Sequence, residues 1–394
     1  MHRIALKAGH DRRARAGHPW IFSNEIQEES FKTCAPGEPV EVEDAQGRFL
    51  GRGYFNPHSL IAIRLLTRQP EEIDADFFRH RILEAWRYRQ RIYPGQTALR
   101  LIYSESDGLP GLIVDRYGDC LSVQLLTLGM EQQREPILSA LAEIVHPRAI
   151  VLRNDAPIRR LEGLALEKGV AAGTLEGPVT LEEGGVSLGV DLLEGQKTGF
   201  FFDQRENRLR MRRYVAGARI LDGFCYTGAW ALQALQGGAA EVVGIDASAR
   251  ALAWAEENGR RNGRSARCRF QRADLFEALK VRVEAGERFD GVILDPPALA
   301  ESRKSLPTAL KGYEKINFYA MRLLGAEGFL FTCSCSYHLT REMFVGVIVR
   351  AARKARKSVR IMEYGQQAPD HPILPTVPET EYLKCLFLEV KDER

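Results

Sequence analysis

The sequence predicts an α/β protein: a doubly wound parallel sheet near the C-terminal end, preceded by a β-rich barrel and a middle α+β domain. Three observations predict this. From about residue 203, short apolar strands alternate with amphipathic helices, which is typical of a parallel sheet covered on both faces. Strand-like runs cut by Gly and Pro fill residues 1–75. The 394-residue chain is also too long for one ordinary core.

The predicted domains follow these changes in pattern. Residues 1–75 form the barrel, residues 76–195 the middle domain, and residues 196–394 the doubly wound domain. The middle domain opens with a helix over 75–93, whose apolar residues recur at helical spacing before Pro94-Gly95 ends it. Its other expected elements are strands at 111–118, 120–128 and 149–153, a helix near 131–145 and a hairpin near 179–193.

Composition excludes some classes of protein. No apolar run approaches the roughly 18 residues that a membrane span needs, and the charged N-terminus does not resemble a signal peptide, so we expect a cytoplasmic protein without membrane contact. The seven cysteines are scattered and include no C-x-x-C pair, which disfavours a disulfide framework and a metal site. The net charge of +3 does not by itself indicate a nucleic-acid partner.

In a doubly wound sheet, ligands bind beyond the carboxyl ends of the strands. The first strand of this region runs into Asp222 and then into the turn Phe224, Cys225, Tyr226, Thr227 and Gly228, which is neither G-x-G-x-x-G nor a P-loop. The next three strands end at Asp246, Asp274 and Asp295-Pro296-Pro297. An acid after the second strand can accept hydrogen bonds from ribose hydroxyls. An acid after the third strand can reach an adenine amino group.

Acidic strand ends with one small glycine turn suit a ligand that has ribose and adenine but no phosphates, and S-adenosylmethionine (SAM) is such a ligand. The predicted cofactor site includes Ser248 and Leu275 beside these acids, and Asp295 itself. Taken singly, Asp222, Asp246 and Asp274 could each be a helix N-cap, because Asp is a favoured cap. A nicotinamide dehydrogenase is disfavoured because bulky side chains fill the turn that pyrophosphate would approach.

Enzymes that methylate amino groups of nucleic acids carry an aromatic residue after the Pro-Pro of the fourth strand, and this chain lacks it. The fifth strand ends in Cys333-Ser334-Cys335. Carbon 5 of a pyrimidine takes a methyl group only after a thiolate has added to carbon 6, and this strand end would place a thiol beside the cofactor. Asp295 could then hold the cytosine. Both cysteines could instead be small buried residues, and strand alternation puts them on one face.

Several segments resemble bacterial large-subunit rRNA methyltransferases with an N-terminal PUA domain, the RlmI-like family that makes 5-methylcytosine. They are "HPWIFSNEI" (18–26), "GRGYFNPHSLIAIRLL" (51–66), "SESDGLPGLIVDRYGD" (104–119), "KTGFFFDQRENR" (197–208), "DGFCYTGAWAL" (222–232), "DPP" (295–297), "KGYEKIN" (311–317) and "SCS" (334–336). The resemblance implies a PUA-like domain over 1–75 and a Rossmann-like class I methyltransferase domain over 196–394. It implies transfer of methyl from SAM to a cytosine in 23S rRNA or a large-subunit precursor.

The resemblance also implies roles for single residues. Phe202, Asp203 and Arg205 would bind the methionine end of SAM, and Cys335 of the "SCS" triplet would be the nucleophile, with Cys333 a bystander. Relatives tend to carry an aromatic residue where this chain has Leu299. A guanine-N7 methyltransferase of rRNA and a non-catalytic RNA-binding relative are the alternative functions, and the sequence does not separate a monomer from a homodimer.

A PUA-like domain gives the basic N-terminal segment a role in binding RNA, which proteins contact through phosphates, 2′-hydroxyls and base stacking. The predicted RNA-binding residues are Lys7, Arg12, Arg13, His18 and Trp20, with "HPW" on an exposed turn. Trp20 could equally be a core residue. A second basic group, Arg350, Arg353, Lys354, Arg356 and Lys357, is expected on the solvated face of one helix.

Overall fold

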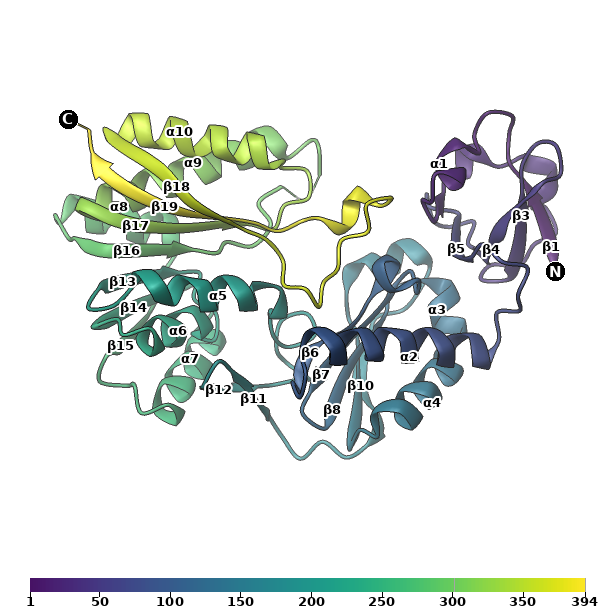
Figure 1. Cartoon of the computed structure of the whole chain (residues 1–394), viewed down its shortest axis with the longest axis horizontal. Coiled ribbons are helices and arrows are strands. Elements are labelled where there is room, and N and C mark those ends of the chain that lie inside the picture. Colours follow the sequence, from purple (N-terminus) through teal and green to yellow (C-terminus); the bar gives the residue numbers. More distant parts are fainter. Residues whose placement is uncertain (301, 394) are drawn as a thin grey trace. The chain divides into compact units, whose positions relative to one another are not determined.

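The structure is a computed structural model that describes residues 1–300 and 302–393 (Figure 1). The chain forms two compact units. Unit 1 comprises Met1–Val179, Val190–Phe202 and Pro369–Thr380, and unit 2 comprises Thr180–Gly189, Asp203–Ala368 and Glu381–Arg394. Each unit is therefore assembled from segments that are far apart in the sequence.

The first part of unit 1 is a five-stranded sheet in the order β1-β3-β4-β5-β2, as expected for a β-rich N-terminal region. Its elements are β1 (His2–Ala5), α1 (Arg12–Arg15), β2 (Trp20–Ile21), β3 (Pro39–Glu43), β4 (Phe49–Phe55) and β5 (Ile63–Thr67). Alternation along β3 buries Val40 and Val42. These two side chains join Ile4, Ile21 and Ile63 in one apolar cluster, which holds the sheet together.

The second part of unit 1 is a sheet in the order β10-β9-β8-β7-β6. Its strands are β6 (Ala98–Tyr103), β7 (Leu112–Tyr117), β8 (Cys120–Leu125), β9 (Ala149–Asn154) and β10 (Glu167–Gly173), and its helices are α2 (Ala75–Ile92), α3 (Leu128–Gln132) and α4 (Arg134–Val145). Asp74 caps α2 by accepting the Phe77 amide at 3.0 Å. Phe78 and Ile82 are buried in the same core as the sheet, as the helical spacing predicts.

Unit 2 confirms the predicted doubly wound sheet. Its strands follow the order β15-β14-β13-β16-β17-β19-β18. They are β13 (Arg219–Gly223), β14 (Glu241–Asp246), β15 (Cys268–Arg272), β16 (Phe289–Leu294), β17 (Leu324–Ser334), β18 (Lys357–Gly365) and β19 (Lys384–Asp392). The first five are parallel, whereas β19 runs antiparallel to both of its neighbours. The apolar runs alone do not predict this reversal at one edge.

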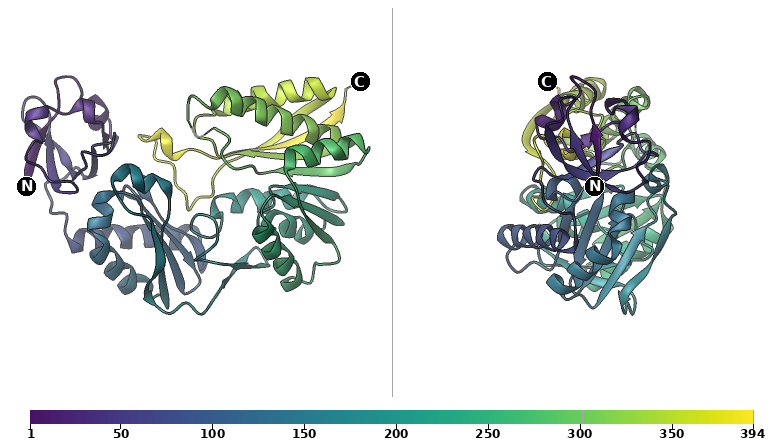
Figure 2. Two further views of the ribbon diagram at one scale, coloured as in Figure 1. Left: turned by 180° about the vertical axis from the view of Figure 1, so that it is seen from behind. Right: turned by 90° about the vertical axis from the view of Figure 1, so that its right-hand side faces the viewer.

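Helices cover both faces of this sheet in Figures 1 and 2. One face carries α5 (Arg205–Met211), α6 (Ala229–Gln236) and α7 (Ala249–Arg261), and the other carries α8 (Leu275–Glu284), α9 (Leu306–Leu323) and α10 (Arg341–Ala355). A hairpin of β11 (Val179–Glu183) and β12 (Val186–Val190) precedes α5 in the chain. Among the described residues, no helix combines the length and apolar character that spanning a membrane requires.

One expectation about the second basic group is wrong. Helix α10 ends at Ala355, and the chain turns through a left-handed Arg356, so Lys357 begins β18 instead of continuing the helix. Lys357 is buried, and its ammonium donates hydrogen bonds to the carbonyls of Leu324 and Gly325 and pairs with Asp392 at 2.6 Å. The helix face therefore comprises only Arg350, Arg353 and Lys354, which are exposed.

Candidate active site

The carboxyl ends of the five parallel strands of unit 2 lie at one edge of the sheet, and the strand order reverses between β13 and β16. A crevice for a ligand is expected at such a point. Asp222 is in β13, while Asp295 follows β16, and the pKa of Asp222 is raised by burial first and then by the negative charge of Asp295. The sheet thus brings together the first and the fourth of the predicted acids.

The turn after β13 has the tight backbone that the sequence suggests. Phe224 and Tyr226 have φ angles of 62° and 48°, in the left-handed region that costs a non-glycine residue roughly 1–2 kcal/mol. Gly228 also has a positive φ, of 81°, and a Cβ there would lie 3.2 Å from Ala255 Cβ. Cys225 and Thr227 point into the protein, being 3% and 5% exposed. Left-handed backbone at two non-glycine residues is costly, and such strained turns cluster at ligand-binding sites.

Asp222 is fully buried, and neither carboxyl oxygen makes a hydrogen bond of good geometry within the described residues. Burial raises its pKa well above the ordinary value, Asp295 adds to this, and the nearby Ala231 amide opposes it. Since Gly228 and not Asp222 caps α6, the N-cap explanation is wrong for this residue. An unsatisfied buried carboxyl is costly, and it is a feature that a hydrogen-bond donor of a ligand would relieve.

Asp246 and Asp274 differ in what their carboxylates do. Asp246 accepts the amides of Tyr226 at 3.0 Å and Ser248 at 2.8 Å, so it fixes the turn, while Ser248 is the cap of α7. Asp274 is the N-cap of α8 and accepts the Glu277 amide at 3.1 Å. Each carboxylate retains lone pairs for further donors, because one oxygen accepts more than one hydrogen bond. Both can therefore still serve ribose or adenine.

Leu275, the first residue of α8, is buried and would meet any Cβ placed on Gly223 at 2.7 Å. Its side chain thus packs under the turn that follows β13. This position gives it an apolar contact with the backbone of the predicted cofactor site.

Asp295 is held by two donors that the sequence did not single out. Gln204 Nε2 donates to Oδ1 at 2.9 Å and Trp230 Nε1 donates to Oδ2 at 2.9 Å. Burial raises the pKa of Asp295 to about 6, although both donors oppose the shift. Near neutral pH this carboxyl can therefore act as an acceptor, and a fraction of it can donate a proton.

The two thiols of the fifth strand occupy different environments. Cys333 is fully buried in β17, opposite Cys385 of β19, and burial raises its pKa well above the ordinary value. Cys335 lies just beyond the strand and is only half-buried. Its Sγ is 3.8 Å from the carbonyl oxygen of Pro296. Because a thiolate is the nucleophile and needs access to its target, the burial of Cys333 favours Cys335.

A hydroxyl cluster fixes the turn that carries Cys335. Ser334 Oγ donates to Tyr313 OH at 2.9 Å, and Ser336 Oγ lies 3.1 Å from the same phenol oxygen. Ser336 Oγ also accepts the Ala300 amide at 3.0 Å. Both serines and Tyr313 are buried, so the cluster links β17, α9 and the segment after Pro-Pro. Tyr313 belongs to the "KGYEKIN" motif, which gives that motif a structural purpose.

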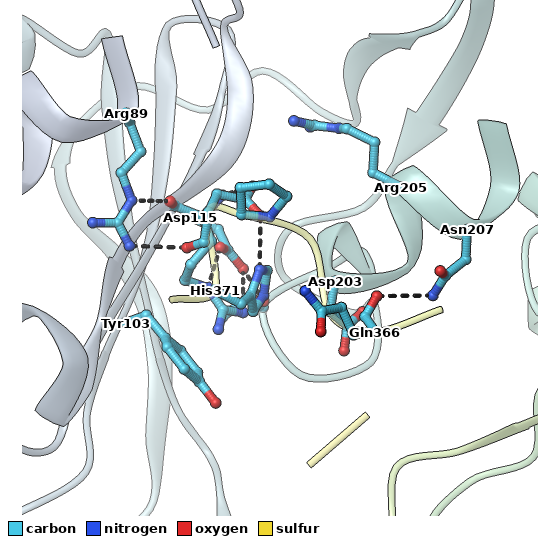
Figure 3. A network of polar contacts seen from close by, with 12 residues as sticks. Arg89, Tyr103, Asp115, Asp203, Arg205, Asn207, Gln366 and His371 are labelled. Atoms are coloured by element: carbon cyan, nitrogen blue, oxygen red, sulfur yellow. Dashed lines mark hydrogen bonds and ion pairs between the residues drawn. The ribbon is translucent and has the colours of Figure 1, made fainter. Parts of the chain in front are cut away.

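Residues 202–207 precede β13. Phe202 is buried in unit 1, where it contacts Tyr117 and Phe200, whereas Asp203 and Arg205 belong to unit 2. Asp203 Oδ2 accepts the hydroxyl of Tyr382 at 2.6 Å. Figure 3 shows Arg205 and Asn207 on α5, with Asn207 donating to the Gln366 carbonyl at 3.0 Å.

Arg205 lies 3.8 Å from the Glu183 carboxylate, which also receives two hydrogen bonds of 2.6 Å from the buried Arg208. Arg205 is itself buried. The predicted cofactor residue therefore belongs to a cluster of charges around Glu183.

Leu299, in the place of the aromatic residue of relatives, is half-buried and packs against the apolar core beneath α9. A Cβ on Gly312 of α9 would lie 3.4 Å from its Cδ1. Leu299 thus contributes to packing and offers no ring for a base.

The predicted RNA-binding residues of unit 1 fall into two groups. Lys7 and Arg12 are exposed. His18 is 5% exposed and Trp20 is half-buried in β2 with its Nε1 donating to Glu105 at 2.8 Å, so "HPW" does not form an exposed turn. Arg13 donates to both oxygens of Glu25, at 2.9 and 3.0 Å, and lies over the ring of Phe22.

Sequence reasoning missed four residues of the site. They are Gln204, Trp230, Tyr382 and Lys384, which contact Asp295, Asp203 or the Cys335 turn. Gln204 and Trp230 lie inside the segments "KTGFFFDQRENR" and "DGFCYTGAWAL", where they could have been noticed. Tyr382 and Lys384 come from the antiparallel strand β19 and its approach, and no motif indicated them.

Comparison with known proteins gives two family matches and several close relatives. Residues 4–68 match a PUA-like domain, and residues 167–388 match the S-adenosylmethionine-dependent methyltransferase family. A protein of Shewanella denitrificans, named ribosomal RNA large subunit methyltransferase I, is 42% identical over 98% of this chain and 99% of its own length. A protein of the same name from Escherichia coli O139:H28 is 40% identical over 97% of this chain and 98% of its own length.

Solved structures agree on the fold. SMU.776, crystallised with S-adenosylhomocysteine (SAH) and described as a methyltransferase, has a TM-score of 0.85 at 20% identity. The match covers 99% of this chain and all of that one. A structure from Streptococcus mutans, described as a SAM-dependent methyltransferase, has a TM-score of 0.83 at 19% identity, with coverage of 99% and 100%. The fold is therefore shared at low sequence identity.

Proposed function

We propose, because this chain belongs to the ribosomal RNA large subunit methyltransferase I family and depends on SAM, that it methylates carbon 5 of a cytosine in 23S rRNA. The observation that carries the proposal is the position of Cys335. Its half-buried thiol lies at the end of β17, 3.8 Å from the Pro296 carbonyl in the Asp295-Pro296-Pro297 segment. Of the two cysteines of this strand, Cys335 alone is accessible.

SAM supplies a methyl group on a sulfonium. The residues of the strand edge fit such a ligand, because Asp222 has an unsatisfied carboxyl and Asp246 and Asp274 retain acceptor capacity. Asp246 would bind the ribose hydroxyls, Asp274 the adenine amino group, and the 222–228 turn with Ser248 and Leu275 would enclose the nucleoside. Asp203 and Arg205 would hold the methionine end, and Phe202 would support them.

Cys335 would work as a covalent nucleophile. Its thiol loses a proton to water, and the sulfur electron pair forms a bond to carbon 6 of the cytosine. The carbon 5–carbon 6 π electrons would then be available at carbon 5 to accept the methyl group that SAM supplies, and the electron pair of the broken methyl–sulfur bond would stay on the departing sulfur. A water molecule removes the carbon-5 proton, and the sulfur leaves carbon 6 with its electron pair.

Asp295 would hold the base during addition. Gln204 and Trp230 each occupy one of its oxygens, which orients the carboxyl and leaves lone pairs for the cytosine amino group. Its pKa of about 6 means that a fraction is protonated near pH 7 and can donate to ring nitrogen 3. Such a donor offsets the negative charge that the ring gains when sulfur adds.

The substrate would be 23S rRNA or a large-subunit precursor. The PUA-like domain supplies a second RNA-binding element, and Lys7 and Arg12 offer it exposed charge. Because Cys335 reaches only a base that leaves its stack, the target cytosine would be unpaired or flipped.

The experiment incubates the full chain with SAM and 23S rRNA, followed by nuclease digestion and mass spectrometry of the nucleosides. We expect 5-methylcytosine to form. Formation of 7-methylguanosine instead would support a guanine-N7 methyltransferase. Binding of SAH without formation of any methylated nucleoside would support a non-catalytic RNA-binding relative.

A second readout tests the covalent step. RNA containing 5-fluorocytosine cannot lose the carbon-5 substituent as a proton, so it should trap a protein–RNA adduct that survives denaturation. The adduct should map to the peptide that contains Cys335. Turnover without any adduct would exclude covalent catalysis while leaving the methyltransferase assignment intact.

A further inference from the structure

Lys384 is a buried lysine next to the turn of Cys335. It is the first residue of β19, where it lies opposite Ser334 in the antiparallel register, and it is 4% exposed. Its ammonium donates to the Ser336 carbonyl at 2.7 Å and to the Tyr382 carbonyl at 2.8 Å. The contact with Ser336 brings the charge to the residue directly after Cys335.

A buried ammonium is costly unless a negative charge compensates it. Within the described residues, Lys384 forms no ion pair with a carboxylate, and two carbonyls are its hydrogen-bond acceptors. Burial lowers its pKa to about 8, and the largest opposing influence is the negative charge of Cys335. Glu381 also raises this pKa, and Arg341 lowers it. The group that best compensates Lys384 is therefore the thiolate of Cys335.

The hydroxyl groups that fix the turn of Cys335 do not supply a positive charge. The cluster of Tyr313, Ser334 and Ser336 is neutral, and burial raises the pKa of Tyr313 so that it stays a phenol. Pro296 presents a carbonyl oxygen to the sulfur, which gives no help to a thiolate. A cation beside a thiol favours the thiolate form, and the ammonium of Lys384 can supply this positive charge.

We infer that Lys384 is a positioning residue whose ammonium holds Cys335 as a thiolate, ready to add to a pyrimidine. The inference rests on the proposed function for its purpose, although the state of the thiol can be measured without RNA. In this step the S–H bond of Cys335 breaks, its proton passes to water, and the electron pair stays on sulfur. Lys384 keeps its own three protons throughout.

The chain contains a matched control at the opposite end of the same sheet. Lys357 is also buried and also donates to two main-chain carbonyls, but it forms an ion pair with Asp392 and begins β18. Strand β18 pairs with β19, and Lys384 and Cys385 lie near the other end of this strand pair. Substituting Lys357 removes a buried lysine without removing a charge from Cys335.

The experiment measures the rate of alkylation of Cys335 by iodoacetamide between pH 5.5 and 10 on the folded full-length protein, with peptide mass spectrometry to identify the modified site. Cys34 serves as an internal reference, because burial raises its pKa to about 12. In the wild type, the midpoint for Cys335 should lie at or below the ordinary thiol value of about 8.5. At pH 7, Cys335 of Lys384→Met should react about tenfold more slowly, and its midpoint should rise by about one pH unit.

Lys384→Arg retains the charge and should react within about threefold of the wild type, and Lys357→Met should match the wild type. Equal midpoints in the wild type and Lys384→Met would overturn the inference. If Lys384→Met does not fold, a wild-type midpoint above the ordinary thiol value overturns it without any variant.

The inference and the proposed function can fail separately. If the alkylation midpoint of Cys335 depends on Lys384 while Cys335→Ala still methylates fully, the thiolate inference is supported and the covalent mechanism is refuted. If Cys335→Ala is inactive but the alkylation midpoint of Cys335 is the same with and without Lys384, the covalent mechanism is supported and the thiolate inference is refuted. In the active enzyme, the acidic limb of the pH–rate profile of Lys384→Met should move to higher pH, so that its activity approaches the wild-type level near pH 9.

Discussion

Two regions of the molecule, the edge of the catalytic sheet and the basic N-terminal segment, treat their charged residues differently. At the edge of the catalytic sheet, Asp222, Asp295 and Lys384 are partly or fully buried, and burial shifts the pKa of each toward the neutral form. In the basic segment at the N-terminus, Arg13 pairs with Glu25 and Arg15 pairs with Asp11 and Asp44. There, the pKa of Asp44 falls to about 2 because Arg48 and backbone amides stabilise the carboxylate.

The difference separates charges that serve the fold from charges that await a ligand. A charge with an internal partner is already stabilised, and a ligand would have to compete for it. A buried charge that lacks an ion-pair partner raises the energy of the folded protein even when neutral groups hydrogen-bond to it, and perturbed groups of this kind cluster at functional sites. The comparison thus assigns chemistry to the catalytic edge and restricts RNA binding in the N-terminal segment to its unpaired cations.

The largest expected effect comes from the two thiols of β17. Cys335→Ala should reduce the rate of methyl transfer to rRNA by about 1,000-fold or more, because removing a covalent nucleophile removes the whole reaction path. Cys333→Ala should stay within a few-fold and should mainly destabilise the protein, since that side chain is fully buried. Radiolabelled methyl incorporation and thermal melting measure the two effects.

The opposite result, an inactive Cys333→Ala and an active Cys335→Ala, would show that burial misidentifies the nucleophile. SAH binding by each variant, measured by calorimetry, controls for a collapsed cofactor site.

The next effect concerns the cofactor. Asp246→Ala should weaken SAH binding by about 10- to 100-fold, because it removes an acceptor for the ribose and also frees the amides of Tyr226 and Ser248. Asp246→Asn keeps one acceptor oxygen and should lose less. Calorimetric titration with SAH checks both variants, and affinity within twofold of the wild type for Asp246→Ala would remove this residue from the site.

A smaller effect appears in stability. The pKa of Asp222 is raised in the folded protein, which therefore holds a proton that the unfolded chain releases above about pH 4. The free energy of unfolding of the wild type therefore falls as pH rises from about 4 toward the folded-state pKa. Asp222→Asn cannot ionise. Its stability relative to the wild type should therefore rise with pH, by up to about 1.4 kcal/mol per pH unit across that window.

Urea unfolding at pH 5 and pH 7.5 measures this difference. A constant difference between Asp222→Asn and the wild type would mean that a neighbour or water satisfies the carboxylate.

The strands and helices of the catalytic sheet were predictable because their apolar runs and amphipathic spacing are local features. The order of the acids along the chain was equally visible, and the parallel sheet brings Asp222 and Asp295 to one edge as expected. The structure then decides what the sequence left open. Gly228 and Ser248 cap α6 and α7, so Asp222 and Asp246 are not N-caps, whereas Asp274 is one.

The unpredicted parts depend on pairing between distant segments. Lys384 reaches the Cys335 turn only because β19 runs antiparallel to β17, a reversal that no local pattern indicates. Likewise, His18 is buried beside Glu379, which is more than 350 residues away in the sequence. Burial also separates Cys333 from Cys335, although alternation along a strand treats them alike.

The smallest expected effect tests the N-terminal half of the comparison. Lys7→Ala and Arg12→Ala should each lower RNA affinity by about threefold and reduce the slope of log affinity against log salt by about 1, because each contributes one exposed charge to phosphate binding. Arg13→Ala should instead lower the melting temperature, since it breaks a bond to both oxygens of Glu25 worth about 1 kcal/mol. Filter binding across salt concentrations and thermal melting distinguish the two classes. If Arg13→Ala changes the salt slope as much as Arg12→Ala does, then RNA does compete for paired charges, and internal pairing no longer separates structural from ligand-binding residues in this protein.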